Sequence, residues 1–290
     1  MSLEKIDDNA SFSNPKTLKA EEIKIYRNYR NLAEIQLKNG SFPFLPNEKG
    51  YLNTYPSVNI GRDTVIIGIA DAILKAKKAL RNYKTDEWIT PYTAKELGYD
   101  PAGLEVTSVV IGGKEDKSVI DFVNIEQFGE KSGGLKLAAG MQVLKHKTEQ
   151  FEKYIEWRKS QGLPCENFKA PDHGADFHGP RKNVVPVLLK DADPATYLST
   201  YYDAVLQNLP VQASKEVADK FVANLKEVIS KKFVNAKGVE QPDVYSVKNV
   251  FEDASHNEHK KEKERREAHK QKNTNPEISS SKKYSGPSMS

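Results

Sequence analysis

Residues 88–98 read WITPYTAKELG, and this stretch contains the clearest local structural signal in the chain. Thr90 is a favoured helix N-cap residue. Pro91 suits the first helical position, because the N–H that proline lacks would have no partner there. Gly98 is a natural helix stop. The stretch therefore predicts a short helix from about Thr90 to Leu97, closed by Gly98.

Two strand-like runs follow this helix. They are EVTSVVI at residues 105–111 and VIDFVNI at residues 119–125, and residues 112–117, GGKEDK, form a hairpin-type connection between them. Alternation in the second run places Ile120 and Phe122 on one face, with Asn124 less clearly beside them. The pattern predicts a small antiparallel sheet.

A long apolar helix is expected upstream of the short one. Its buried face is formed by residues at helical spacing, and Asn59 or Asp63 can cap it. The apolar positions are Val65, Ile66, Ile69, Ile73, Leu74 and Leu80. An earlier helix from Glu21 to Gly40 and an extended aromatic segment at residues 41–46 precede it. We expect the sheet to pack on the long helix and to complete an α+β module near Phe128.

The second half of the chain is expected to be mostly helical. Helices are predicted at 135–161, 194–208 and 214–233, with residues 130–134 as a linker and 162–186 as a long loop. The fold class is therefore α+β, with helices packed on a small β-sheet in the N-terminal module and a mostly α-helical region after it. The predicted divisions are a flexible tail at 1–20, a domain at 21–130, the helical region at 135–250 and a disordered charged tail at 251–290.

Bulk composition narrows the class of protein. The chain has 290 residues and 38% hydrophobic residues, with a mean hydropathy of −0.66. The formal net charge is +4, which suits a polyanion partner only if the cations gather on one face. The single cysteine, Cys165, cannot form an internal disulfide, and neither a leader nor a membrane-spanning run is seen. We expect a cytoplasmic protein that does not enter a membrane.

Several motifs, in order, resemble the N-terminal domain of the ArdC family of plasmid antirestriction proteins. They are Tyr55-Pro56-Ser57-Val58-Asn59, the set Trp88, Thr90, Ala94, Leu97 and Gly98, and Val123-Asn124-Ile125-Glu126-Gln127. The family has Gly where this chain has Ser57, and Phe where it has Val123. The resemblance covers about a third of the chain.

The resemblance implies a domain that binds single-stranded DNA, in a plasmid or phage protein of a bacterial host cell. It implies coating or protecting single strands, with antirestriction as a related role. The family often carries a metallopeptidase with an HExxH motif, which this chain lacks. The spacing of His256-Asn257-Glu258-His259 does not match that motif.

A single-strand-binding surface needs cations for the phosphates and flat rings on which bases stack. The predicted binding residues are Tyr55, Asn59, Arg62, Lys77, Lys78, Trp88, Thr90, Tyr92, Lys95 and Gln127. Several of them also have a purely structural interpretation. Trp88 could be a core residue, Asn59 a helix cap, Gln127 a partner of loop backbone, and the lysines a solvated helix end.

No catalytic residue, metal ligand or cofactor is predicted. Cys165, Asp172, His173, Asp176 and His178 lie close in sequence, but their spacing is not typical of a zinc site. Two other function classes stay open. One is a structural component that binds a protein partner through the helical region, and the other is a divergent hydrolase that uses the Cys165–His178 loop.

Overall fold

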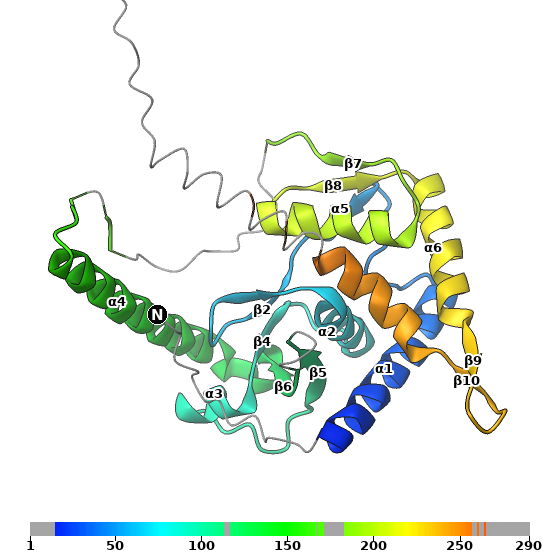
Figure 1. The fold of residues 1–290 in the computed structure, drawn as a ribbon, viewed down its shortest axis with the longest axis horizontal. Coiled ribbons are helices and arrows are strands. Elements are labelled where there is room, and N and C mark those ends of the chain that lie inside the picture. Colours follow the sequence, from blue (N-terminus) through cyan, green and yellow to red (C-terminus); the bar gives the residue numbers. More distant parts are fainter. Residues whose placement is uncertain are drawn as a thin grey trace, which may run out of the picture.

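A five-stranded sheet with strand order β3-β2-β4-β6-β5 forms the centre of the N-terminal half (Figure 1). The computed structural model describes residues 15–112, 117–166, 168–170 and 183–256, together with residues 260 and 264. The strands are β2 (Ser57–Asn59), β3 (Thr64–Ile66), β4 (Glu87–Ile89), β5 (Thr107–Ile111) and β6 (Ser118–Asn124). Helices and strands are mixed throughout the described chain, so the α+β prediction is confirmed.

Local sequence signals were sufficient for two parts of this sheet region. Helix α3 (Pro91–Glu96) begins after Thr90, whose side chain accepts a hydrogen bond from the N–H of Thr93. Strands β5 and β6 pair antiparallel, with Thr107 opposite Phe122 and Ile111 opposite Ser118. Both predictions are confirmed, because a cap and a hairpin depend mainly on neighbouring residues.

The start of the long helix differs from the prediction. Val65 and Ile66 belong to β3, which pairs antiparallel with β2, and helix α2 (Gly68–Arg81) begins only at Gly68. Gly68 has a φ of +71°, and a Cβ built there would lie 2.8 Å from Ser255 Oγ. Neither Asn59 nor Asp63 caps the helix, since Ile67 is its N-cap residue. Residues 64–66 form a strand and not the first turn of the helix, because the β2–β3 hairpin gains backbone hydrogen bonds within the sheet.

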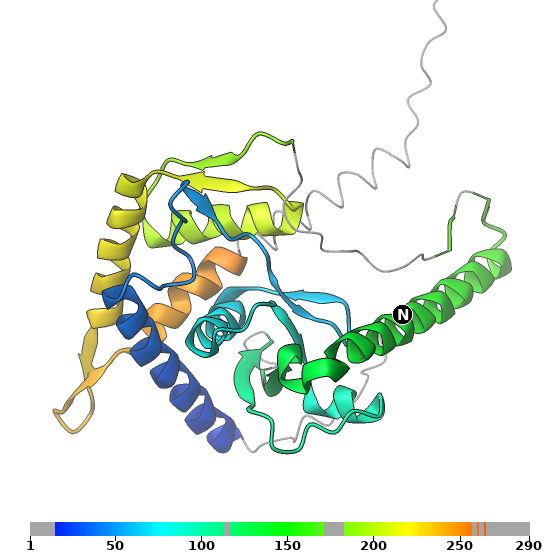
Figure 2. The ribbon, with the colours of Figure 1, turned by 180° about the vertical axis from the view of Figure 1, so that it is seen from behind.

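The helix at the N-terminal end is longer than predicted. Helix α1 (Pro15–Lys38) starts inside the segment expected to be a flexible tail, so residues 15–20 correct that boundary. Its Tyr26, Tyr29, Ala33 and Leu37 are buried. Helix α1 packs against α2 and also against α6 (Lys215–Ser230), which lies far away in sequence (Figure 2).

The helical region begins without a linker. The 3-10 segment η1 (Ile125–Lys131) runs into helix α4 (Ser132–Ser160), so residues 130–134 are helical or part of the helical junction. The remaining elements are β1 (Tyr51–Leu52), β7 (Val187–Leu189), α5 (Pro194–Gln207), β8 (Val211–Ala213), β9 (Lys232–Val234) and β10 (Glu240–Pro242). A last helix covers residues 244–256.

One hydrophobic core joins the two halves of the chain. Phe44 lies 5.2 Å, ring centre to ring centre, from Tyr201 and 5.4 Å from Phe251. Strand β1 pairs with β8, so the first half also contributes an edge to the sheet β1-β8-β7 of the second half. The predicted boundary near residue 130 therefore does not coincide with a division of the core.

The C-terminal boundary also moves. Phe251 and Ala254 are buried in the core, so residues 251–256 are part of the folded structure and not of a charged tail. Most of the later residues lie outside the described part of the chain. Among the helices that the structure describes, none has the length and hydropathy needed to cross a membrane.

Candidate nucleic-acid interface

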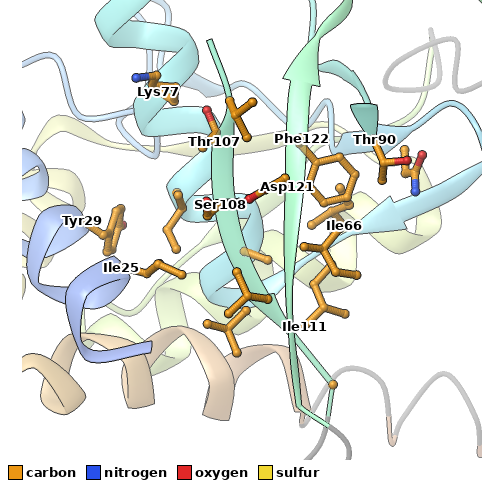
Figure 3. Close-up of a pocket in the computed structure, with 18 of the residues that line it drawn as sticks. Ile25, Tyr29, Ile66, Lys77, Thr90, Thr107, Ser108, Ile111, Asp121 and Phe122 are labelled. Carbon is orange, nitrogen blue, oxygen red and sulfur yellow. Dashed lines mark hydrogen bonds between the residues drawn. The ribbon is translucent and has the colours of Figure 1, made fainter. Parts of the chain in front are cut away.

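Five of the ten predicted binding residues line a cavity of about 1360 Å³ that extends along both sides of the β5–β6 hairpin (Figure 3). It is bounded by α1, α2, the β2–β3 hairpin, the start of α3 and the β5–β6 hairpin. Asn59, Arg62, Lys77, Thr90 and Tyr92 line it. Figure 3 shows Ile25 and Tyr29 of α1 on one side of the β5–β6 hairpin and Thr90 on the other.

The turn between β2 and β3 is held in place from three directions. Asn59 Oδ1 accepts a hydrogen bond from the N–H of Gly61 at 3.1 Å. A Cβ at Gly61 would lie only 2.7 Å from Thr93 Cγ2, so the turn packs closely on α3. Asp63 forms a 2.5 Å ion pair with Lys147 of α4. The turn therefore presents the exposed Arg62 from a fixed backbone.

The first turn of α3 supplies the exposed ring of the cavity. Tyr92 follows the Thr90 cap and Pro91, and 47% of its surface is exposed. A hydrogen bond with Glu96 and the charge of that carboxylate raise the pKa of the Tyr92 hydroxyl. Thr90 itself serves as the cap, so its hydroxyl is engaged with Thr93.

The predicted cations of α2 are paired with acids. Glu105 accepts from Lys77 at 2.5 Å and from Arg81 at 2.6 Å, and Lys78 lies 2.5 Å from Asp86. The hydrogen bond from Arg81, with further help from Lys77, lowers the pKa of Glu105 to about 2. A phosphate would have to compete with these carboxylates. Lys77 and Lys78 are thus weaker candidates than their sequence positions indicate.

Gln127 has a structural role in this molecule. Its Oε1 accepts from the N–H of Glu105 at 2.8 Å, and its Nε2 donates to the carbonyl of Glu105 at 2.9 Å. Asn124 likewise donates to the carbonyl of Thr85. Both side chains satisfy backbone groups of loops that approach the sheet, which is the structural interpretation given above for Gln127.

Trp88 is a core residue. It is fully buried on β4, and its ring meets Tyr83 edge-on with ring centres 6.1 Å apart. Because neighbouring strand residues point to opposite faces, Ile89 instead joins a second cluster with Ala94, Ile125 and Leu135. Trp88 cannot stack on a base without unfolding the sheet, which excludes it from the binding surface.

Tyr55 and Lys95 are exposed but do not line the cavity. Tyr55 precedes β2, whereas Asn59 ends it, so the strand separates the two side chains. Lys95 lies on α3 one residue beyond the buried Ala94. Tyr55 and Lys95 therefore lie apart from the predicted binding residues that line the cavity.

A buried ionic cluster around Lys75 was not identified from the sequence. Lys75 is 3% exposed, donates to the carbonyl of Tyr55 at 2.5 Å, and lies 3.7 Å from Asp71 and 3.6 Å from Asp86. Burial disfavours its charged form, but Asp71, Tyr201 and Asp86 outweigh that effect and keep its pKa above the ordinary value. The i,i+4 spacing of Asp71 and Lys75 was the available signal.

Charges of both signs line the cavity. Lys24 and Arg62 face it together with Lys77, while Glu21, Asp121 and Glu252 supply negative charge. Ser108 donates to Asp121 at 2.6 Å. Burial raises the pKa of Glu252, while Lys248 opposes that effect. The arrangement is suited to a ligand that carries both charge and apolar surface.

The metal and hydrolase alternatives fall largely outside the described residues. Asp172, His173, Asp176 and His178 all belong to the undescribed segment 171–182. Cys165 is partly exposed, and its Sγ lies 3.9 Å from the carbonyl oxygen of Ile155. Within the described ranges, no cluster of three or more His, Cys, Asp or Glu residues could hold a metal ion.

Comparison of the chain with protein-family models, with curated proteins and with solved structures finds no match.

Proposed function

We propose that this protein binds single-stranded DNA at the Arg62–Tyr92 edge of the cavity, without catalysing a reaction. The observation that carries the proposal is the close packing of Gly61 on Thr93. Arg62 follows Gly61 and Tyr92 precedes Thr93 in the chain, and both residues are exposed and line the cavity. A cation for phosphate and a ring for a base are the two groups that single-strand binding requires.

The rest of the cavity supports a short binding site. Leu80 and Val106 line it and are 55% and 42% exposed, which gives apolar surface for further bases. The carboxylates of Asp121 and Glu252 disfavour DNA phosphates near them. The bound DNA strand would therefore run along the part of the cavity that Arg62 lines. In the setting implied by the motif resemblance, the protein would coat or protect single strands of a phage or plasmid in the bacterial cytoplasm.

The test is a salt titration of binding to a labelled single-stranded oligonucleotide, followed by fluorescence anisotropy. Replacing Tyr92 by Ala should weaken binding about 5- to 140-fold, because a base–aromatic stack contributes about 1–3 kcal/mol. Arg62→Ala should lower the slope of log affinity against log salt by about 0.7, the loss of one phosphate contact.

Two matched variants serve as controls. Tyr51→Ala removes another exposed tyrosine, on β1, and Lys237→Ala removes another exposed cation, in the β9–β10 turn. Neither residue lines the cavity. Equal losses in all four variants would indicate nonspecific attraction, and absence of binding at low salt would reject the proposal.

A second candidate function is a structural role in which the second half binds a protein partner. Strand β7 is an edge of its sheet, and Leu188 on it is 58% exposed, as is 84% of Val185 just before it. Such an edge suits the addition of a strand from a partner. A stoichiometric protein that copurifies after nuclease treatment, and is lost in Leu188→Pro, would favour this role.

A further inference from the structure

Helix α4 contacts the body of the protein through its first half, as far as Lys147, which pairs with Asp63, and then leaves it. Leu135, Ala139 and Val143 are buried, and they repeat every four residues on the side that faces the body. Within α4, all of which the structure describes, these are the buried residues. Figures 1 and 2 both show the remainder of the helix projecting away from the other elements.

A second apolar stripe runs along a different side of α4. Leu137, Met141, Leu144, Phe151 and Ile155, with Thr148 among them, follow one another at spacings of four, three, four, three and four residues. Leu137 and Met141 are 67% and 65% exposed, and the other members are partly exposed. A hollow of about 320 Å³ lies on the stripe beside Met141, Leu144 and Thr148.

This spacing is typical of a coiled-coil seam. A mean repeat of 3.5 residues keeps side chains on the line where two helices meet, whereas the stripe that faces the body repeats every four. Charged side chains flank the seam at equivalent positions of two successive heptads, Lys145 on one and Glu152 on the next. Such flanking positions select the partner and its orientation.

We propose that α4 pairs with α4 of a second copy of this chain, antiparallel, about a two-fold axis near His146. This alignment sets Leu137 against Ile155 of the second copy, Met141 against its Phe151, and Leu144 against its Thr148. It also sets Lys145 beside Glu152 of the second copy, twice by symmetry. A parallel pair would crowd both protein bodies at one end, because the body covers the first turns of each α4.

The seam spans almost three heptads, which is short, so the dimer should be weak and concentration-dependent. Sedimentation velocity over a concentration series should show a shift from monomer toward dimer. Met141→Glu should remain monomeric up to sub-millimolar concentration. Gln142→Glu places the same charge on the neighbouring exposed position outside the seam and should associate as the unmodified chain does.

Circular dichroism of both variants checks that α4 and the core remain folded. A monomeric unmodified chain at every concentration overturns the proposal, including the case in which another protein or an undescribed segment of the same chain covers the stripe. Equal association by Met141→Glu and the unmodified chain would also overturn it.

A charge exchange tests the antiparallel alignment itself. Lys145→Glu and Glu152→Lys should each weaken self-association, because each creates a pair of like charges across the seam. Mixing the two variants should restore association, since every cross-seam pair then joins opposite charges. A mixture that associates no better than its separate components contradicts this alignment.

Discussion

Helices α2 and α4 differ in which of their side chains are buried. Helix α2 buries a charged residue, Lys75, at 3% exposure, whereas α4 leaves Leu137 at 67% and Met141 at 65%. Both helices mix lysine with aliphatic residues. The difference lies in their neighbours. The chain before β2, the segment before β4 and α5 converge on α2, whereas the second half of α4 projects away from the body (Figures 1 and 2).

Burial in this molecule therefore follows tertiary neighbours more closely than residue type. Lys75 is tolerated in the interior because Asp71 and Asp86 supply opposite charge and the carbonyl of Tyr55 accepts a hydrogen bond. A buried charge without such partners would be very costly. The exposed leucine of α4, by contrast, costs little in the monomer and stays available to a partner.

The largest predicted difference is in the stability lost when a lysine of each helix is replaced. Lys75→Ala should destabilise the protein by about 3–5 kcal/mol, because it leaves two carboxylates in the interior without their counter-charge. Lys153→Ala, on the exposed side of α4, should change stability by less than about 0.5 kcal/mol. Urea unfolding followed by circular dichroism measures both, and similar values for the two variants would remove the contrast.

The aliphatic residues should show the reverse dependence on neighbours. Leu74→Ala in α2 should cost about 2–5 kcal/mol, since Leu74 is fully buried and its removal leaves a cavity. Leu137→Ala in α4 should stay within about 0.5 kcal/mol of the unmodified protein. Thermal unfolding at concentrations where the chain is monomeric gives the comparison. A large loss for Leu137→Ala would mean that α4 packs against something in the monomer.

The smallest predicted effect is a pH-dependent change in stability caused by Glu105, which pairs with the C-terminal end of α2. Because Arg81 and Lys77 lower the folded-state pKa of Glu105 from 4.5 to about 2, this group stabilises the fold above pH 4.5. That contribution is lost as the pH falls from 4.5 to about 2. Solvent screening keeps it below about 1 kcal/mol. Glu105→Gln should match the unmodified protein near pH 2 and be slightly less stable at pH 6. An equal difference at both values would contradict the pKa argument.

The parts of the fold that sequence could predict rest on local chemistry. Thr90 and Pro91 define the start of α3 through groups within three residues, and the β5–β6 hairpin follows from alternation around a glycine turn. The helices predicted at 135–161 and 194–208 follow from apolar spacing, as does the helix predicted at 214–233, which ends at Ser230 because residues 232–234 form β9. None of these needs a distant partner.

The parts that could not be predicted depend on contacts between distant residues. The sequence around Val65 and Ile66 is compatible with either a helix or a strand. These residues form a strand because they pair with β2. The pairing of β1 with β8 joins residues about 160 positions apart. The burial of Lys75 as a charged residue likewise depends on Asp86 and Tyr201, and a helical sequence pattern does not reveal these distant partners.

The candidate site divides in the same way. The structure places Trp88 in the core and engages Lys77, Lys78 and Gln127 in internal contacts. The fit of Gly61 on Thr93 brings the turn that carries Arg62 close to the start of α3, which carries Tyr92. Residue type suggested the candidates, while long-range packing decided which of them lie at the cavity and which lie elsewhere.

The shared core has a consequence for the synthesis of the protein on the ribosome. Phe44 cannot be covered until Tyr201 and Phe251 have been made, so the first 130 residues cannot fold to completion alone. The 124 residues from 131 to 254 take roughly 6–25 s to translate at about 5–20 residues per second. During that interval Phe44 lacks these two partners, and a fragment that ends before residue 251 should therefore be prone to aggregate.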